Sequence, residues 1–411
     1  MDIQTSTPSQ AISEPSDRLP LEQQVARLQA LLEATRQVHS TIHSNEVLTQ
    51  AARILVRELE MDGALFLAPS SSEPLVAYGD VPPAPYKGCH RFPLLSRDQQ
   101  LLAELIVAAP RDAVFSLYEQ DFAEGLALQT AVALENATLH ERDLEWARVQ
   151  QDLNAARSLQ QSLLPAAMPV IPGYSVAARS TTCYEVGGDY LDTIPLADGS
   201  HLIVVADVAG KGLASAIVAT SFRSALRSLA GQSLPLSELA ARMGNQHWEE
   251  GSEARRRYVT ALFMRLMPES GEIEIVNAGH NPPALILPDK SVLMVEASGT
   301  PLGMLPGMEY AAQTLPFPNG SRILLYTDGL TEVFCEEEEF GTERLVSLFR
   351  DAPQLYSEPI LDLLWEALAS FSCNAPQTDD MTALAICHLD PSDRTQGDRA
   401  VHSLLQEFVN P

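Results

Sequence analysis

Four aspartates stand at the ends of strand-like apolar runs, and their carboxylates are the side chains best suited to chemistry. They are Asp189 in EVGGDY, Asp207 in VVADVAGKG, Asp328 in LLYTDGLTE and Asp379 in QTDDMT. Glycines or further acidic residues stand near each of them, and glycine lets the backbone approach an ion closely. Carboxylates at the ends of several strands can converge on one edge of a sheet.

Carboxylate and water oxygens are the hard ligands that Mg²⁺ or Mn²⁺ prefers. No His/Cys cluster in the sequence offers a softer set of ligands. A single Asp-Gly pair is most often only a turn. The residues by themselves therefore leave two interpretations open, a divalent-metal site and a set of ordinary turns.

The elements that must position these aspartates lie between residues 173 and 390. Turn residues there separate seven strand-like segments, GYSVAAR, SHLIVVADV, RRYVTALFMRLM, GEIEIVNAG, NPPALILP, SRILLYTDG and MTALAICHL. Helical stretches are expected at 212–230, 235–247, 342–350 and 358–371. Strands interrupted by groups of helices predict a layered α+β domain, which we place at residues 165–390.

A second α+β domain is predicted at residues 20–140. Leu21, Val25, Leu28 and Leu32 follow helical spacing along one face. The segments GALFLAP, EPLVAYG and ELIVAAP are strand-like and are separated by Pro, Gly and Ser.

Residues 139–164 are predicted to form a helix that links the two domains. In a heptad, one core position is taken by Leu139, Trp146, Leu153 and Gln160, and the other by Arg142, Val149, Ala156 and Leu163. Because two of these eight are polar, two alternatives stay open: a helix packed on a neighbouring domain, and a parallel coiled coil that makes a homodimer. The three prolines of LPAAMPVIPG end the helix.

The composition of the 411-residue chain narrows the class of partner. The formal net charge is −27, which argues against binding to nucleic acid or to an anionic membrane. Residues 1–18 are rich in Ser, Thr, Pro and Gln and are predicted to be disordered. Residues 391–411 form a polar C-terminal tail with a short amphipathic piece.

Cysteine usage and hydropathy indicate the compartment. Five cysteines, an odd number without CxxC spacing, predict neither a disulfide framework nor a zinc site. The acidic N-terminus has no signal-peptide core, and no run of about 18 apolar residues suggests a membrane span. We therefore expect a soluble cytoplasmic protein in a reducing compartment.

The segment from LQQSLLP to TDDMTALAI strongly resembles the PPM-type protein phosphatases, and more narrowly the bacterial SpoIIE/RsbU-like group. The matching motifs run in order over more than half of the chain: LQQSLLP, EVGGDYLD, VVADVAGKGLASA, YVTALF, VNAGHNPPALI, GTPLGM, ILLYTDGLTEV, FGTERL and TDDMT. The resemblance implies an α-β-β-α sandwich with two Mn²⁺ or Mg²⁺ ions at one edge, which activate water to attack phosphorus.

The same resemblance implies a role for each residue of the site. Asp189 and Asp207 would ligate one or both ions, together with the carbonyl oxygen of Val208. Asp328 and Asp379 would complete the shell of the second ion. Asp380 is expected to support the ligands rather than to bind directly, although the choice between Asp379 and Asp380 stays open.

Three further residues are weaker candidates near the site. Asn277 and His280 in NAGHNPP either line the cleft or fix a turn by hydrogen bonds. Lys211 in AGKGLASA either meets phosphate or substrate or is a solvated lysine.

Residues 20–140 resemble a GAF domain, above all in the closing stretch LQTAVALENATL. The resemblance implies a sensor that binds a small molecule, senses redox state or light, or dimerises. A sensor joined by a helix to a phosphatase predicts that the sensor regulates the metal site.

The sequence thus predicts a metal-dependent protein serine/threonine phosphatase. By resemblance, its substrate is a phosphorylated regulatory protein such as an anti-sigma-factor antagonist. Two alternatives stay open, a catalytically silent signalling scaffold and a hydrolase of small phosphoesters.

Overall fold

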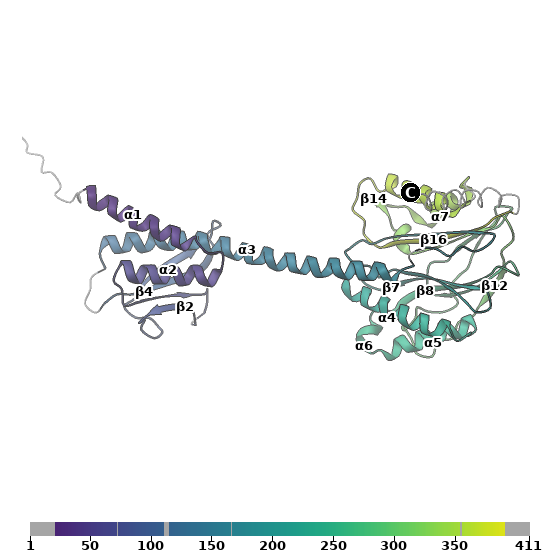
Figure 1. The fold of residues 1–411 in the computed structure, drawn as a ribbon, viewed down its shortest axis with the longest axis horizontal. Helices are drawn as coiled ribbons and strands as arrows, with labels where there is room; N and C mark the ends of the chain where they lie inside the picture. The colour runs from purple at the N-terminus through teal and green to yellow at the C-terminus, as the bar shows by residue number, and fades with distance from the viewer. Residues whose placement is uncertain (1–20, 72, 111–114, 166, 354–355, 391–411) are drawn as a thin grey trace, which may run out of the picture. The chain divides into compact units, whose positions relative to one another are not determined.

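The computed structural model describes residues 21–71, 73–110, 115–165, 167–353 and 356–390. The predicted tails, 1–18 and 391–411, lie outside the described residues. The chain divides into two compact units between Gln150 and Gln151, each with its own hydrophobic core (Figure 1).

The N-terminal unit is a four-stranded antiparallel sheet with helices on one face. The strand order is β2-β1-β4-β3. Its elements are α1 (Leu21–Val38), α2 (Ser44–Glu58), β1 (Gly63–Leu67), β2 (Pro74–Gly79), β3 (His90–Leu95), β4 (Leu101–Ala108) and the first half of α3 (Leu117–Leu163).

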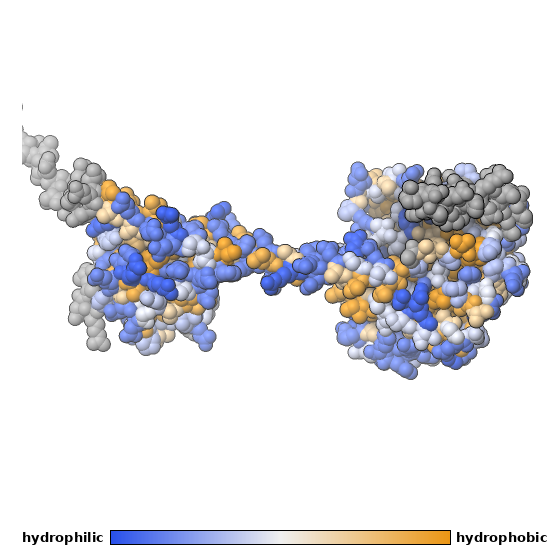
Figure 2. All heavy atoms as spheres, viewed as in Figure 1, coloured by the Kyte–Doolittle hydropathy of each residue, from blue (hydrophilic) through white to orange (hydrophobic). Residues whose placement is uncertain are grey.

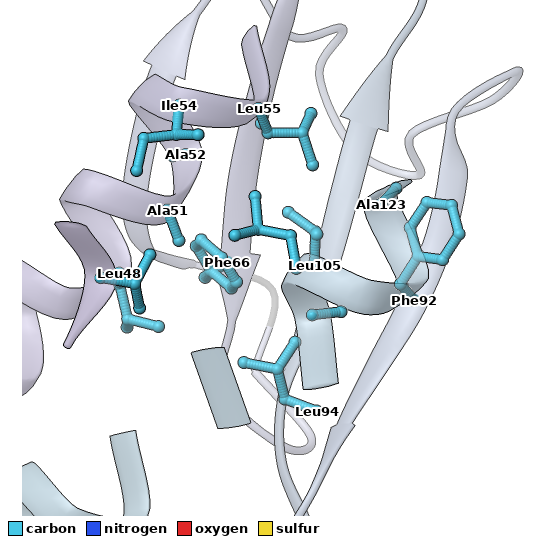
Figure 3. Packing of buried hydrophobic residues seen from close by; sticks show 14 of the residues in the cluster. Leu48, Ala51, Ala52, Ile54, Leu55, Phe66, Phe92, Leu94, Leu105 and Ala123 are labelled. Carbon is cyan, nitrogen blue, oxygen red and sulfur yellow. The ribbon is translucent and has the colours of Figure 1, made fainter. Parts of the chain in front are cut away.

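The core of this unit forms where the helices pack on the sheet. Figure 3 shows Leu48 and Leu55 of α2 pointing toward Phe66 and Leu105 of the sheet, and all four side chains are buried. This mixture of helices and sheet is compatible with a GAF-like fold, and the GAF identification itself stays a prediction.

A single helix, α3, contains nearly all of the predicted linker helix of residues 139–164 and begins well before it. It runs for 47 residues from Leu117 to Leu163. Its buried residues lie between Phe122 and Ala137. Further along, Leu139, Trp146 and Val149 are exposed, and Figure 2 shows hydrophobic side chains at the surface of the helix. The part of α3 beyond Ala137 thus keeps an unburied apolar stripe.

The C-terminal unit contains two five-stranded antiparallel sheets, with orders β11-β10-β13-β16-β5 and β12-β9-β8-β7-β6. The first sheet is formed by β5 (Tyr174–Thr181), β10 (Ala284–Ile286), β11 (Val292–Met294), β13 (Arg322–Tyr326) and β16 (Met381–His388). The second is formed by β6 (Tyr190–Pro195), β7 (His201–Val208), β8 (Val259–Met267), β9 (Glu272–Ala278) and β12 (Gln313–Pro316).

Helices cover the outer face of each sheet, and the two inner faces pack on each other. A core of residues such as Ile203, Leu262 and Leu384 lies between the sheets. The outer helices are α4 (Leu213–Ala230), α5 (Leu236–Glu249), α6 (Ser252–Arg255), α7 (Gly341–Asp351) and α8 (Ser357–Phe371). Helices α4 and α5 pack on the sheet that contains β7, and α7 and α8 pack on the sheet that contains β16. The predicted α-β-β-α sandwich is confirmed.

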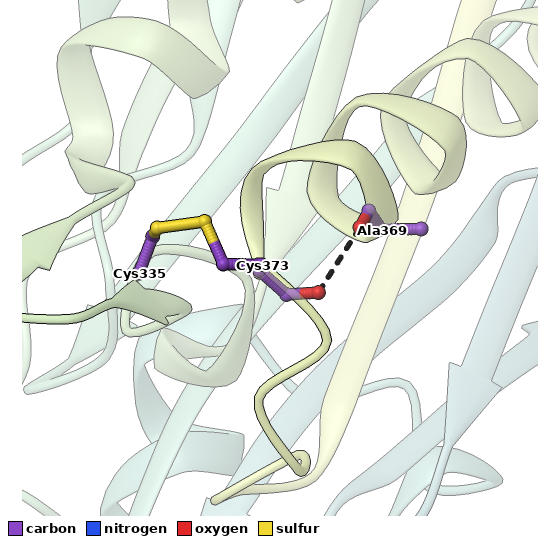
Figure 4. The surroundings of a disulfide bond; sticks show 4 residues. Cys335, Ala369 and Cys373 are labelled. Atoms are coloured by element: carbon purple, nitrogen blue, oxygen red, sulfur yellow. Dashed lines mark hydrogen bonds between the residues drawn. A yellow bond between two sulfur atoms is a disulfide. The ribbon is translucent and has the colours of Figure 1, made fainter.

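A disulfide joins Cys335 to Cys373, and it corrects the sequence expectation that the cysteines form no disulfide framework. Cys335 lies in the small hairpin of β14 (Phe334–Cys335) and β15 (Glu338–Glu339), and Cys373 follows α8 (Figure 4). The spacing of the cysteines gave no sign of this pair, because the fold brings together two residues 38 positions apart.

None of the helices that the structure describes combines the length and the apolar character needed to span a bilayer.

Candidate metal centre

Asp189 and Asp207 lie opposite each other at one end of the sheet that contains β6 and β7. The two strands pair Tyr190 with Ala206, so antiparallel register places Asp189 beside Asp207. Side chains alternate along β7, and Ile203 and Val205 point into the core between the sheets. Asp207 continues that alternation and faces the other sheet.

The second sheet brings Asp328 and Asp379 to the same edge of the sandwich. Strand β13 ends at Tyr326, and Asp328 opens the short 3₁₀ helix η1 (Asp328–Leu330). Its neighbour β16 begins at Met381, just after Asp379 and Asp380. Because Tyr326 pairs with Ala383, the two acidic segments leave adjacent strands at one end.

One buried hydrogen bond ties the two sheets together at this edge. The Oγ1 of Thr327 donates to Oδ2 of Asp189 over 2.8 Å. Thr327 is fully buried, and Asp189 is only 8% exposed. The bond fixes the Asp189 carboxylate against the segment that leads from β13 to Asp328.

The carboxylates repel one another, and burial strengthens the effect. Burial, followed by the charges of Asp328 and Asp379, raises the pKa of Asp207 to about 7. Burial and the charge of Asp207 raise the pKa of Asp189 well above its usual range. Burial and Asp379 likewise raise the pKa of Asp328. The cluster holds more negative charge than its surroundings balance.

Both carboxylate oxygens of Asp380 accept hydrogen bonds from the loop before Asp189. Its Oδ1 accepts a hydrogen bond from the amide of Cys183, and its Oδ2 accepts one from the amide of Gly188, each over 2.7 Å. Asp379 uses one oxygen to accept a bond from the amide of Asp380. The arrangement favours Asp379 as the direct ligand and Asp380 as the residue that positions the loop.

Lys211 supplies positive charge beside Asp379. Its ammonium lies 2.8 Å from Oδ2 of Asp379 and donates to the carbonyl oxygen of Thr378. Within the described part of the chain, no three His, Cys, Asp or Glu side chains lie close enough together to complete an ion site. A cation there would compete with Lys211 for the Asp379 carboxylate.

Glycines allow the acidic segments to approach one another. A Cβ added to Gly329 would lie 2.0 Å from the carbonyl oxygen of Asp380, and one added to Gly188 would lie 2.9 Å from the carbonyl oxygen of Val208. Any side chain at position 329 would push Asp328 and Asp379 apart.

Asn277 and His280 fix a turn beside the site. Asn277 accepts a hydrogen bond from the amide of His280 and donates one to the carbonyl oxygen of Val295. Nδ1 of His280 is 2.9 Å from Oγ1 of Thr260, which is paired with Asp207 in the sheet. Burial lowers the pKa of His280 to about 4, so this imidazole is neutral at physiological pH. These contacts fit the structural alternative for both residues.

The sequence interpretation did not include three residues that contact or surround the aspartates. Thr327 donates a hydrogen bond to Asp189, and Gln160 donates one to the loop that precedes Asp189. Burial, followed by the charges of Asp328 and Asp379, raises the pKa of Glu332. Thr327 could have been found, because alternation along LLYTDG turns it toward the inner face.

The donor set suits a divalent cation rather than a softer metal. It offers the carboxylates of Asp189, Asp207, Asp328 and Asp379, together with the carbonyl oxygen of Val208. Oxygen donors are what Mg²⁺ and Mn²⁺ prefer. Bound cations would also neutralise the repulsion that raises the pKa values of these carboxyl groups. Whether each residue is a ligand stays a prediction.

Comparisons with known proteins agree with this arrangement. Residues 197–389, just under half of the chain, match the family model described as "Stage II sporulation protein E (SpoIIE)". The fold is shared with the SiaA-PP2C domain of Pseudomonas aeruginosa, at a TM-score of 0.52 and 20% identity over 60% of this chain and 99% of that one.

Two curated relatives are similar in sequence. "Protein IcfG" of Synechocystis sp. is 25% identical over 57% of this chain and 41% of its own length. "Phosphoserine phosphatase RsbU" of Bacillus subtilis is 26% identical over 62% of this chain and 74% of its own length. The chain therefore spans less than half of the first relative and about three quarters of the second.

The C-terminal unit thus combines a two-sheet sandwich with an acidic edge, and it shares its fold with a PP2C domain. Residues 197–389 of this unit are similar to the SpoIIE family.

Proposed function

We propose that the chain is a metal-dependent protein serine/threonine phosphatase. The observation that carries the proposal is the convergence of Asp189, Asp207, Asp328 and Asp379 at one edge of a domain similar to the SpoIIE family. Two Mn²⁺ or Mg²⁺ ions are the proposed cofactors. Bound there, such ions lower the pKa of water and neutralise charge on the phosphoryl group.

The protein residues hold and orient the reacting groups. Asp189 and Asp207 would hold the cations from one sheet, together with the carbonyl oxygen of Val208, and Asp328 and Asp379 would hold them from the other. Thr327 keeps the Asp189 carboxylate in place through its 2.8 Å hydrogen bond. If Asp379 held a cation, the Lys211 ammonium would be free to meet a phosphoryl oxygen, which a flexible point charge can do.

The proposed substrate is a phosphoserine or phosphothreonine on a regulatory protein such as an anti-sigma-factor antagonist. The similarity to a relative named as a phosphoserine phosphatase supports this class. The proposal places the chain in the cytoplasm, in partner-switching regulation.

Regulation by the GAF-like unit is a further part of the proposal. A cavity of about 590 Å³ lies between β3 and α3, with Arg91, Phe92 and Leu128 in its wall. This volume is in the range of small-molecule sites, roughly 300–1,000 Å³. A ligand there would act on the helix that reaches the phosphatase domain.

Dimerisation through the linker helix is proposed because apolar side chains of this helix are exposed to solvent. Leu139 is 52% exposed and Trp146 is 66% exposed. Charge at these positions, as in Leu139→Glu and Trp146→Glu, should lower the mass of the particle measured by light scattering from dimer to monomer. A wild-type chain that is monomeric at micromolar concentration contradicts this part.

The phosphatase itself is tested by hydrolysis of p-nitrophenyl phosphate during a Mn²⁺ titration. Asp189→Asn and Asp328→Asn should each abolish metal-dependent turnover, while Asp289→Asn, at an exposed turn of the same domain, should leave it unchanged. Binding of Mn²⁺ without turnover of any phosphoester supports the scaffold alternative. Faster turnover of nucleotides than of phosphoproteins supports the small-phosphoester alternative.

A further inference from the structure

A small apolar cavity lies directly beside the acidic edge of the phosphatase domain. Its volume is about 240 Å³. The wall is formed by the end of α8, the loop that follows it and the segment after Asp328, with Phe334, Trp365, Leu368 and Met381 as its large apolar members. Among the described residues that line it, only Glu332 is charged.

The cavity shares its wall with the proposed metal ligands. Gly329 and Thr378 both line it, and they directly follow Asp328 and precede Asp379 in the chain. Consecutive Cα atoms are about 3.8 Å apart. A group seated in the cavity therefore lies within a few residues' reach of a phosphoryl group held by the aspartates, because an extended peptide advances about 3.3 Å per residue.

The wall is fixed by contacts that do not depend on an occupant. Nε1 of Trp365 donates to Oγ1 of Thr181 over 3.4 Å. Nε2 of Gln377 donates both to the carbonyl oxygen of Thr181 and to that of Asp379. The disulfide Cys335–Cys373 joins the chain neighbours of Phe334 and Ser372, which both line the cavity.

The size of the cavity decides between classes of occupant. Sites for drug-sized ligands measure roughly 300–1,000 Å³, and this one is smaller. It fits one bulky apolar side chain. Apolar pockets of this kind discriminate between side chains by about 10-fold or more for a difference of a few methylenes.

We propose that this cavity binds an apolar side chain of the phosphoprotein substrate, close in sequence to the phosphorylated residue. The inference rests on the proposed phosphatase function and adds a determinant of specificity to it. Trp365 and Phe334 would contact the substrate side chain, while the aspartates hold the phosphoryl group.

The test compares phosphoserine peptides that carry either Leu or Ala at each of the three positions on both sides of the phosphoserine. Full-length protein with Mn²⁺ should hydrolyse the Leu peptide at one of these positions with a kcat/KM about 10-fold higher than the Ala peptide. Ala369→Phe, which fills the cavity from the exposed face of α8, should abolish that preference. Hydrolysis of p-nitrophenyl phosphate, which reaches only the metal site, should not change.

Ser370→Phe is the matched control, because residue 370 is exposed on the same helix outside the cavity lining. It should keep both the preference and the p-nitrophenyl phosphate activity. If Ala369→Phe loses all activity, Phe334→Ala decides instead, since Phe334 is 41% exposed and its truncation widens the cavity. That variant should reduce the preference for Leu at least threefold.

Three results overturn the inference and leave the phosphatase function intact. The first is equal hydrolysis of Leu and Ala peptides at every position by an enzyme that hydrolyses p-nitrophenyl phosphate. The second is a preference that both Ala369→Phe and Phe334→Ala retain. The third is faster hydrolysis of all substrates by Ala369→Phe, which indicates that an inhibitory segment or molecule occupied the cavity. A wild-type chain without Mn²⁺-dependent hydrolysis of any substrate instead contradicts the proposed function.

Discussion

Gln160, in the last turn of α3, exchanges two hydrogen bonds with the backbone of Gly187. Its Nε2 donates to the carbonyl oxygen of Gly187 over 2.7 Å, and its Oε1 accepts from the amide of Gly187 over 3.2 Å. The next residue, Gly188, donates to Asp380, and Asp189 follows. The linker helix is thus fastened to the loop that carries the first proposed ligand.

Gln160→Ala should lower phosphatase activity, because it releases the loop that carries Asp189. The change leaves two buried backbone groups of Gly187 without partners, at a cost of about 1–3 kcal/mol each. The loop can relax by shifting Asp189, so we expect a fall of about tenfold in kcat for p-nitrophenyl phosphate and a higher Mn²⁺ requirement. Gln161→Ala, at the exposed neighbouring position, is the control. Equal activity of the two variants would show that the contact does not position the loop.

In the metal-free protein, stability should fall as pH rises from about 4 to about 7. The pKa of the Asp207 carboxyl is about 7 in the folded chain and near 3.8 when unfolded. The folded state therefore binds more protons in this window, and its advantage is complete below the unfolded pKa and lost as pH passes the folded pKa. Asp189 and Asp328 shift in the same direction.

Urea unfolding in the presence of a chelator measures this dependence. The free energy of unfolding should decrease by a few kcal/mol across the window. Asp207→Asn should flatten the slope and stabilise the metal-free protein at pH 8, because it removes one of the repelling charges. Saturating Mn²⁺ should abolish the decrease in the wild-type protein. A stability that rises with pH in the chelated protein contradicts the electrostatic account.

Many strands of the layered domain, and the aspartates at their ends, could be predicted from the sequence, because strand alternation and strand ends are local patterns, whereas the two-sheet sandwich was implied by the family resemblance. The same patterns did not predict a strand whose sequence departs from the usual composition of strands. Strand β3 contains Pro93 and was not predicted, yet it is an edge strand, where proline is tolerated. Contacts between distant residues also escaped, as in the hydrogen bond from Thr327 to Asp189, 138 positions away.

Gly329→Ala should abolish activity and destabilise the C-terminal unit. The new methyl group would lie 2.0 Å from the carbonyl oxygen of Asp380, so the segments that carry Asp328 and Asp379 must separate. Overpacking of this kind costs about 1–3 kcal/mol. Gly231→Ala is the matched control, since its Cβ meets nothing within 4 Å. Thermal unfolding and p-nitrophenyl phosphate hydrolysis should distinguish the two variants, and full activity of Gly329→Ala would contradict the close packing of these segments.

The Cys335–Cys373 disulfide should contribute to both stability and substrate preference. It closes a loop of 38 residues, and chain-entropy arguments give such a loop about 4 kcal/mol. Replacing both cysteines by serine should lower the thermal midpoint, and a reducing agent should lower it in the wild-type protein but not in the double variant. Cys89→Ser, which removes a free thiol of the N-terminal unit, should change neither. Because the bond joins the neighbours of Phe334 and Ser372 in the cavity wall, the double variant should also lose part of its preference for apolar phosphopeptides while it keeps its p-nitrophenyl phosphate activity.

Labelling of all five cysteines as free thiols in the oxidised, denatured protein would contradict the bond itself, whereas an intact bond without effect on peptide preference would restrict its role to stability.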